Sequence, residues 1–184
     1  MTKNHCAEPV TPRESYIAWM PSAPSLDIGT PTSEESAAMG VALDEARKAL
    51  LHDDVPVGAV VIVDGEIIAQ RHNERELTGD PTAHAEVLAL RDAAAKVGSW
   101  RLDTATLVVT LEPCPMCAGA ALNARVAKIV FGASDPKAGA TGSLYNFCAD
   151  SRLNHEIPVL PGVSVEACAQ LLSDFFSERR ASSR

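Results

Sequence analysis

Two short segments, separated by about thirty residues, place the strongest constraint on how this chain folds. They read His84-Ala85-Glu86 and Pro113-Cys114-Pro115-Met116-Cys117. One histidine and two cysteines can supply three ligands to a tetrahedral zinc ion, and a fourth position left to water distinguishes a catalytic zinc from a structural one. The folded chain must therefore bring the two segments together.

The first segment is predicted to begin a helix. Thr82 can cap a helix over 83–97, and Gly98 is its stop signal. Residues i and i+2 lie roughly 200° apart around a helix, so His84 and Glu86 could not converge on one ion from its middle. They can do so from the first turn, if that end of the helix points at the metal.

The second segment follows a buried strand predicted over 106–110 and begins a helix over 114–124, with Pro115 suited to the first turn. Cys114 and Cys117 are three residues apart, which places both thiols on one face. The partial positive charge of a helix N-terminus favours thiolates. A lone C-x-x-C is a weak signal, but the joint pattern predicts an open, catalytic zinc site.

The joint pattern, H-x-E followed by P-C-x-x-C, is the signature of zinc-dependent nucleobase deaminases, in which the glutamate is a general acid/base and not a ligand. Zinc lowers the pKa of a bound water to about 7, and Glu86 would then carry protons to the ring and to the departing ammonia. Two alternatives remain open. Glu86 could merely complement the helix dipole, or Cys148, Cys168 or His155 could close the metal site and make the chain a non-catalytic zinc-stabilised module.

The rest of the chain predicts one domain after a leader. Residues 1–31 contain five prolines and no sustained periodicity, which predicts a disordered leader, and 32–184 would form the zinc-dependent deaminase domain. A capping box at Thr32-Ser33-Glu34-Glu35 starts an amphipathic helix. Strands over 57–63 and 66–70 flank an Asp64-Gly65 hairpin turn.

The later elements alternate strand and helix. A strand is predicted over 127–131, a short strand within 159–165 and a last helix over 166–180, while 73–81 reads as a polar, turn-rich connection. This order predicts an α/β fold, a three-layer α/β/α sandwich with a mixed central sheet.

Composition narrows the class of protein further. The formal net charge of −8 argues against broad, non-specific nucleic-acid binding, so an RNA partner would need local basic residues. No apolar run is long enough to span a membrane, and no signal peptide is recognisable, which predicts a cytoplasmic location and no membrane partner. With five cysteines, two of them in a C-x-x-C, metal binding is more plausible than a disulfide framework; Cys148 and Cys168 read as small buried residues.

Several further motifs resemble the bacterial tRNA-specific adenosine deaminases, whose fold is cytidine deaminase-like. The resemblance covers about 33–180 and includes 54–60 (DVPVGAV), 80–86 (DPTAHAE), 110–120 (TLEPCPMCAGA), 131–133 (FGA) with Asp135 and Lys137, 142–144 (GSL) and 171–176 (LLSDFF). Members convert adenosine to inosine at the wobble position of a tRNA anticodon and work as homodimers.

The resemblance implies a role for individual residues. His84, Cys114 and Cys117 would hold one zinc ion per subunit, and Glu86 would shuttle protons. The residues implied in binding the tRNA anticodon stem-loop are Asn73, Ala85, Asp135, Lys137, Asn154, Phe176, Arg179 and Arg180. Asn73 matches the asparagine that hydrogen-bonds the flipped-out nucleotide, although an asparagine in a loop is also a common turn residue.

The alternative enzyme is a guanine deaminase or another zinc deaminase of free bases or nucleosides. Guanine deaminase is the first of these, because it shares H-A-E and P-C-P-M-C but acts on a free base. The metal signature does not separate the two. The lead-in at 110–112, the 132–137 loop and the Phe-Phe-x-x-Arg-Arg helix end all favour the tRNA enzyme.

Overall fold

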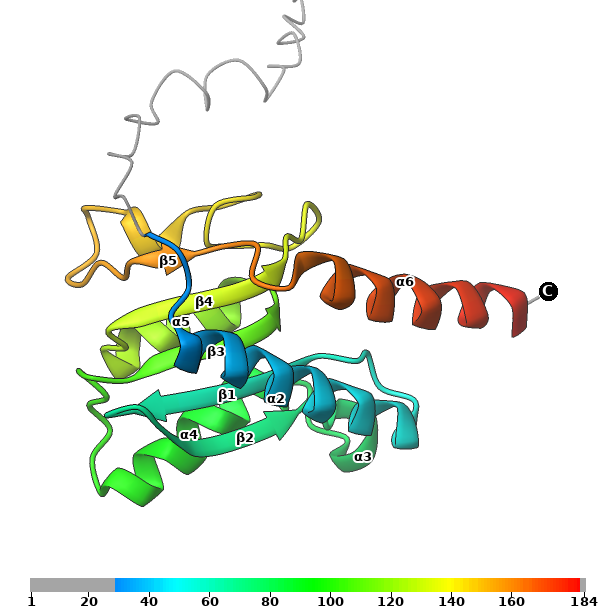
Figure 1. Ribbon diagram of the computed structural model, residues 1–184, viewed down its shortest axis with the longest axis horizontal. Coiled ribbons are helices and arrows are strands. Elements are labelled where there is room, and N and C mark those ends of the chain that lie inside the picture. The colour runs from blue at the N-terminus through cyan, green and yellow to red at the C-terminus, as the bar shows by residue number, and fades with distance from the viewer. Residues whose placement is uncertain (1–28, 183–184) are drawn as a thin grey trace, which may run out of the picture.

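The computed structural model describes residues 29–182, which form a five-stranded sheet in the order β2-β1-β3-β4-β5 (Figure 1). β1 is antiparallel to both β2 and β3, whereas β3, β4 and β5 run parallel. The strands are β1 (Gly58–Val63), β2 (Glu66–His72), β3 (Thr106–Leu111), β4 (Lys128–Ala133) and β5 (Val159–Leu160). The predicted mixed sheet is confirmed, and each strand lies within a few residues of its predicted range.

Helices cover both faces of the sheet, as predicted (Figure 1). α2 and α6 pack on one face around Met39 and Cys168, and α4 and α5 pack on the other around Leu107 and Ile129. The long helices are α2 (Ser33–Ala49), α4 (Ala85–Val97), α5 (Pro115–Ala124) and α6 (Val165–Ser182); shorter ones are α3 (Arg75–Thr78), η1 (Leu50–His52) and η2 (Phe147–Ala149).

Local sequence explains how two of these elements begin. Thr32 and Glu35 form the predicted capping box at the start of α2, each side chain accepting a hydrogen bond from the other residue's backbone N–H. Asp64 and Gly65 have φ angles of 51° and 81°, the left-handed pair that a two-residue type I′ turn requires. The predicted hairpin is therefore confirmed.

Gly58 sets how closely the sheet approaches α2. A Cβ at this position would lie 1.9 Å from the carbonyl oxygen of Ala42 and 2.6 Å from the amide nitrogen of Ala46. Only a residue without a side chain allows the first residue of β1 to contact the α2 backbone. This contact fixes the start of β1, where Val57 enters the pocket described below.

The connections place two helix N-termini at one edge of the sheet. β3 ends at Leu111 and α5 begins at Pro115, while β2 ends at His72 and leads through α3 to α4. Because β2 and β3 both end at this edge, α4 and α5 start side by side there (Figure 1). The fold thus brings the two segments of the metal pattern together.

Some predictions fall outside these residues or need correction. The leader predicted over 1–31 lies almost wholly outside the described range, as does Cys6. The last strand is only Val159–Leu160, and the short helix α3 was missed within the connection predicted over 73–81. Along 29–182, none of the helices has the length and apolarity needed to traverse a lipid bilayer.

Candidate active site

Three ligand atoms converge where α4 and α5 begin. Nδ1 of His84 lies 3.8 Å from Sγ of Cys114 and 3.5 Å from Sγ of Cys117, and the two sulfurs are 3.6 Å apart. Tetrahedral zinc, with Zn–S bonds of about 2.3 Å and Zn–N bonds of about 2.0–2.1 Å, requires separations of about 3.8 Å between sulfurs and about 3.6 Å between sulfur and nitrogen. The spacing and chemistry of this group therefore fit a zinc ion.

Two of the ligands are the N-cap residues of their helices. His84 has an extended backbone (φ −78°, ψ 145°) and precedes α4, and Cys114 (φ −72°, ψ 172°) precedes α5. The prediction that Thr82 caps the first helix was wrong, because the amide and hydroxyl of Thr82 both donate to Asp80 in a tight turn. The true cap position leaves the imidazole of His84 pointing beyond the helix end.

Asn73 takes over the capping of α4. Its Oδ1 accepts the backbone N–H of Ala85 at 2.9 Å, and its Nδ2 donates to the carbonyl oxygen of Val55 at 3.0 Å. Asn73 is buried, and its backbone N–H donates to Val57. The side chain thus ties the start of α4 to the segment before β1, and it occupies the N–H of Ala85.

Glu86 lies in the first turn of α4 and is 3% exposed. Its Oε2 is the one buried side-chain oxygen or nitrogen within 29–182 that has no hydrogen-bond partner. Burial raises the pKa of this carboxyl above its ordinary value of 4.5. A buried acid with one unpartnered oxygen, close to a group of candidate metal ligands, is unusual for a structural residue.

The two cysteines differ in their protonation when no metal is bound. The sulfur–sulfur hydrogen bond with Cys117 lowers the pKa of Cys114 to about 4, whereas the same contact and burial raise the pKa of Cys117. The hydrogen bond with Cys114 also raises the pKa of His84. The pair therefore shares one negative charge, and a metal ion would bind it with release of a proton.

The remaining candidate ligands lie elsewhere. Cys168 packs against Met39 on the opposite face of the sheet, and Cys148 is buried in the α4–α5 core. His155 approaches the carbonyl oxygen of Val126. In the part of the chain that the structure describes, no further histidine, cysteine or carboxylate joins the three-ligand group.

A hollow of about 140 Å³ opens beside the ligand group. It combines apolar walls with four charged residues, and it is lined by Val55, Val57, Asn73, Arg75, His84, Glu86, Leu111, Glu112, Cys114, Asp135 and Ala138. Of the residues predicted to bind substrate, Asn73 and Asp135 are therefore in the pocket wall.

Arg75 is the one arginine or lysine among these lining residues, and Asp54 holds it in place. Nε and Nη2 of Arg75 donate to Oδ1 of Asp54 at 3.2 and 2.8 Å. Asp54 is fully buried and also accepts the N–H groups of Val55 and Glu76. Burial alone would raise the pKa of Asp54, but the hydrogen bonds from Arg75 and the backbone outweigh it, so the pKa lies below 3.8.

The other predicted substrate residues lie outside the pocket. Lys137 is exposed on the loop after β4, and Asn154 accepts hydrogen bonds from Arg125 just beyond the C-terminal end of α5, away from the metal ligands. Phe176, Arg179 and Arg180 are exposed on α6, which extends past the edge where the pocket opens (Figure 1). Arg179 is paired with Asp53 at 3.0 Å.

The sequence reasoning missed three residues that build the pocket. No role was predicted for Asp54, Arg75 or Glu112. A signal existed for two of them: Asp54, the second residue of the Asp53-Asp54 pair, and Glu112 each adjoin an apolar run, and a buried acid must be paired. Their partners could not be read from the sequence.

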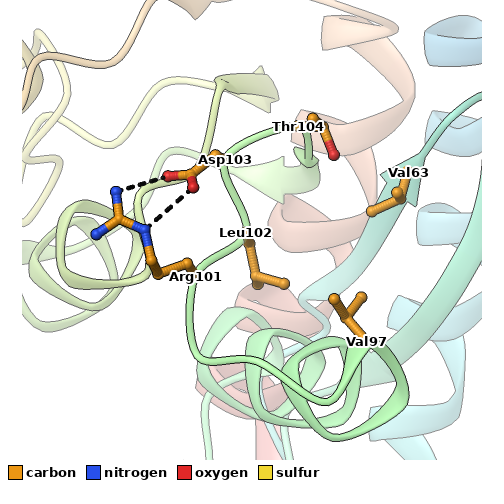
Figure 2. A pocket seen from close by; sticks show the side chains of 6 residues that line it. All are labelled: Val63, Val97, Arg101, Leu102, Asp103 and Thr104. Carbon is orange, nitrogen blue, oxygen red and sulfur yellow. Dashed lines mark hydrogen bonds and ion pairs between the residues drawn. The ribbon is translucent and has the colours of Figure 1, made fainter.

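A second hollow, of about 190 Å³, lies at the opposite edge of the sheet (Figure 2). Val63, Val97 and Leu102 line it together with Thr104 and the Arg101–Asp103 ion pair. No metal-ligand group and no unpartnered buried polar atom among residues 29–182 belongs to it.

Comparison with known proteins identifies the family. The family model described as MafB19-like deaminase matches residues 33–180. The tRNA-specific adenosine deaminase of Bacillus subtilis (strain 168) is 49% identical over 148 residues, which cover 80% of this chain and 92% of that protein. That of Haemophilus influenzae is 49% identical over 143 residues, covering 77% and 83%. The chain belongs to the MafB19-like deaminases and, among them, to the family of tRNA-specific adenosine deaminases.

Solved structures agree with this assignment. A structure from work on A-to-I editing by tRNA:A34 deaminases at the wobble position matches with a TM-score of 0.72 at 42% identity, covering 74% of this chain and 99% of that chain. The guanine deaminase from Nitrosomonas europaea matches with a TM-score of 0.65 at 26% identity, covering 83% and 97%. The predicted deaminase fold and the predicted resemblance are both confirmed.

Proposed function

We propose that the protein hydrolytically deaminates adenosine to inosine at the wobble position of a tRNA anticodon. The observation that carries this chemistry is a three-ligand group beside a buried carboxylate whose Oε2 has no hydrogen-bond partner along 29–182. The substrate is inferred from relatives, since the tRNA-specific adenosine deaminases of Bacillus subtilis and Haemophilus influenzae are 49% identical to this chain, whereas two guanine deaminase structures are 26% and 32% identical.

We assign His84, Cys114 and Cys117 to one zinc ion. When bound, zinc lowers the pKa of a coordinated water from 15.7 to about 7, which makes hydroxide available at neutral pH. Glu86 would take one proton from the attacking water and deliver it to a ring nitrogen, and would then move the remaining hydroxyl proton to the amino group, which leaves as ammonia while the C=O forms. One carboxylate is sufficient because these transfers occur in sequence.

The other pocket residues bind and orient the nucleotide. Asn73 uses only one N–H and one lone pair of its amide within the protein, so a second donor and a second lone pair remain for the flipped-out nucleotide. Asp135 adds a carboxylate to the pocket wall, next to the exposed Lys137. Ala85 does not line the pocket, and we assign it an indirect role, because its N–H holds the side chain of Asn73 in place.

Capture of the anticodon stem-loop is assigned to Lys137, Asn154, Phe176, Arg179 and Arg180. The aromatic and cationic groups of α6 suit the unpaired bases and phosphates of an RNA loop. We further propose a homodimer in the cytoplasm. Sedimentation at working concentration should then give a mass near twice 19.4 kDa.

The function is tested by incubating the zinc-loaded protein with an anticodon stem-loop that carries a wobble adenosine. Free adenosine, cytidine and guanine serve as parallel substrates. Ammonia and inosine from the stem-loop alone are expected. Release of ammonia from guanine, with none from the stem-loop, would replace this proposal with a guanine deaminase.

A further inference from the structure

Glu112 is a buried carboxylate that the proposed proton transfers do not use. It is 2% exposed and follows β3, two residues before Cys114. Its oxygens accept five hydrogen bonds from one segment, 135–143, which we call the wall loop. The donors are the N–H groups of Asp135 (3.0 Å), Thr141 (3.1 Å) and Ser143 (2.9 Å) and the hydroxyls of Thr141 (3.3 Å) and Ser143.

These contacts hold the wall loop by its backbone. Three of the five donors are main-chain amides, and hydrogen bonds to an ionised acceptor are roughly twice as strong as neutral ones. Two further backbone hydrogen bonds flank these contacts, both at 2.8 Å: Glu112 donates to Ala133 at the end of β4, and Ala140 of the wall loop donates to Pro113. A shift of the wall loop would therefore break several of its hydrogen bonds to the carboxylate of Glu112.

Gly139 shows how closely the wall loop lies against this side chain. A Cβ on Gly139 would come within 2.3 Å of the carboxylate of Glu112 and within 2.6 Å of the carbonyl oxygen of Asp135. Any larger residue would displace the loop from the carboxylate. The close approach therefore depends on both residues of the contact, the glycine at 139 and the glutamate at 112.

The wall loop forms part of the pocket, since Asp135 and Ala138 line it together with His84 and Glu86 from the start of α4. We propose that Glu112 is a positioning residue, which holds the wall loop at a fixed distance from the ligand Cys114 and so sets the shape of the site that receives the flipped-out nucleotide. This inference rests on the proposed function for the identity of the substrate. It assigns Glu112 no contact with the reacting atoms.

A purely structural role makes a different prediction. If Glu112 only stabilised the fold, its loss would lower the melting temperature and leave the kinetics of the folded, zinc-loaded enzyme unchanged. A positioning role predicts a higher KM for the stem-loop, because a mobile wall binds the nucleotide less well, with a smaller effect on kcat.

The test compares Glu112→Gln with Glu35→Gln in the zinc-loaded full chain. The glutamine amide keeps the shape of the side chain but turns an NH₂ group toward at least one backbone donor. Glu35 is a matched control in the first turn of α2, outside the pocket. It is 6% exposed and accepts hydrogen bonds from Lys128 and from the backbone N–H of Thr32. Zinc content, melting temperature, KM and kcat for the stem-loop, and amide hydrogen exchange of the wall loop are measured.

For Glu112→Gln we expect a zinc content equal to the parent's, a KM raised by about tenfold or more, and wall-loop exchange accelerated by about tenfold or more. Glu35→Gln should change the melting temperature alone. If Glu112→Gln does not fold, Ser143→Ala removes one donor and keeps the carboxylate, and it should move KM and exchange in the same direction by a few-fold.

The proposal would be overturned if the folded Glu112→Gln variant had the same KM for the stem-loop and the same amide exchange rates in the wall loop as the parent enzyme. Failure of the proposed function is a separate outcome, visible in the parent enzyme as activity on guanine and none on the stem-loop. In that case the exchange rates and the KM for guanine still decide whether Glu112 positions the wall loop.

Discussion

The two edges of the sheet each carry a hollow, and the larger hollow has fewer polar and titratable groups in its wall than the smaller one. The hollow at the edge of Val63 and Thr104 has a volume of about 190 Å³, against about 140 Å³ beside the metal-ligand group (Figure 2). The first is lined by aliphatic side chains and an ion pair whose partners are 51% and 55% exposed. Buried polar groups, and not volume, distinguish the candidate active site.

Helix direction accounts for this difference. α4 and α5 both begin at the ligand edge, where their N–H groups and partial positive charge favour thiolates and carboxylates. At the other edge α4 ends at Gly98, whose left-handed backbone (φ 74°) closes the helix with a hydrogen bond to Ala94. The helix end at that edge is therefore already satisfied and offers no comparable site.

The largest effect should come from Glu86. Glu86→Gln should keep the fold and the metal but reduce deamination by about 10⁴-fold or more, because one group serves several proton transfers. Asp103→Asn, at the opposite hollow, is the control and should leave kcat/KM within about twofold. Single-turnover assays on the stem-loop would measure both. Activity of Glu86→Gln within tenfold of the parent would exclude Glu86 as the proton shuttle.

Loss of a ligand should remove the metal. Cys117→Ser should lower zinc from about one ion per chain to a small fraction, since a hydroxyl is a far poorer ligand than a thiolate. Cys148→Ser is the matched control, because Cys148 is equally buried and lies outside the ligand group. Elemental analysis gives the content, and X-ray absorption should show two sulfur neighbours. Three sulfurs would contradict the open site.

The stability of the two edges can be compared through one aspartate at each, Asp54 at the ligand edge and Asp103 at the opposite edge. Asp54→Asn should lower the free energy of unfolding at pH 7 by about 1–3 kcal/mol, because a buried acceptor of four hydrogen bonds is weakened. Asp103→Asn should cost about 0–1 kcal/mol, since its ion pair is exposed. Chemical denaturation measures both. Equal losses would show that burial at the ligand edge adds nothing.

The pH dependence of the Asp54 effect follows from its lowered pKa. The stability that the carboxylate contributes is fully present above the unfolded-state pKa near 3.8 and is lost as the pH falls through the lower folded-state pKa. The gap in unfolding free energy between the parent and Asp54→Asn should therefore narrow below about pH 3.8. A gap that widens on acidification would have the wrong sign.

The smallest effect concerns RNA capture by α6. Replacing both Arg179 and Arg180 with alanine should raise the KM for the stem-loop by a few-fold and flatten its salt dependence, because fewer phosphate contacts release fewer counterions. Asp53→Asn is the control, since it removes the Asp53–Arg179 ion pair and keeps both arginines. An unaltered KM and salt slope would remove α6 from the RNA-binding surface and direct attention to Lys137.

Local sequence rules predicted most of the fold. The capping box at Thr32, the Asp64-Gly65 turn and the apolar strand runs depend on neighbours within a few residues, so they can be read directly. The start of α4 was misplaced because Asp80 competes for the donors of Thr82. α3 was missed because it has only four residues, which is too short a segment to show a helical periodicity.

Only part of the candidate site could be predicted from the sequence. The three residues that converge as candidate metal ligands were predicted, because their types and spacing are specific to zinc chemistry. The two buried anchors were not, because Asp54 holds Arg75 from 21 residues away and Glu112 holds Ser143 from 31 residues away. Such pairings arise from the packing of separate elements, and a single sequence carries no signal for them.

The unpartnered oxygen of Glu86 also bears on how this fold has evolved. A buried carboxylate with a raised pKa and no partner at Oε2 burdens the folded state, and selection for stability alone would replace it with an apolar side chain. If Glu86 is the proposed proton shuttle, this loss of stability accompanies its role in turnover. A metal-free Glu86→Leu protein should melt at a higher temperature than its metal-free parent, and a lineage released from catalysis would be free to drift in that direction.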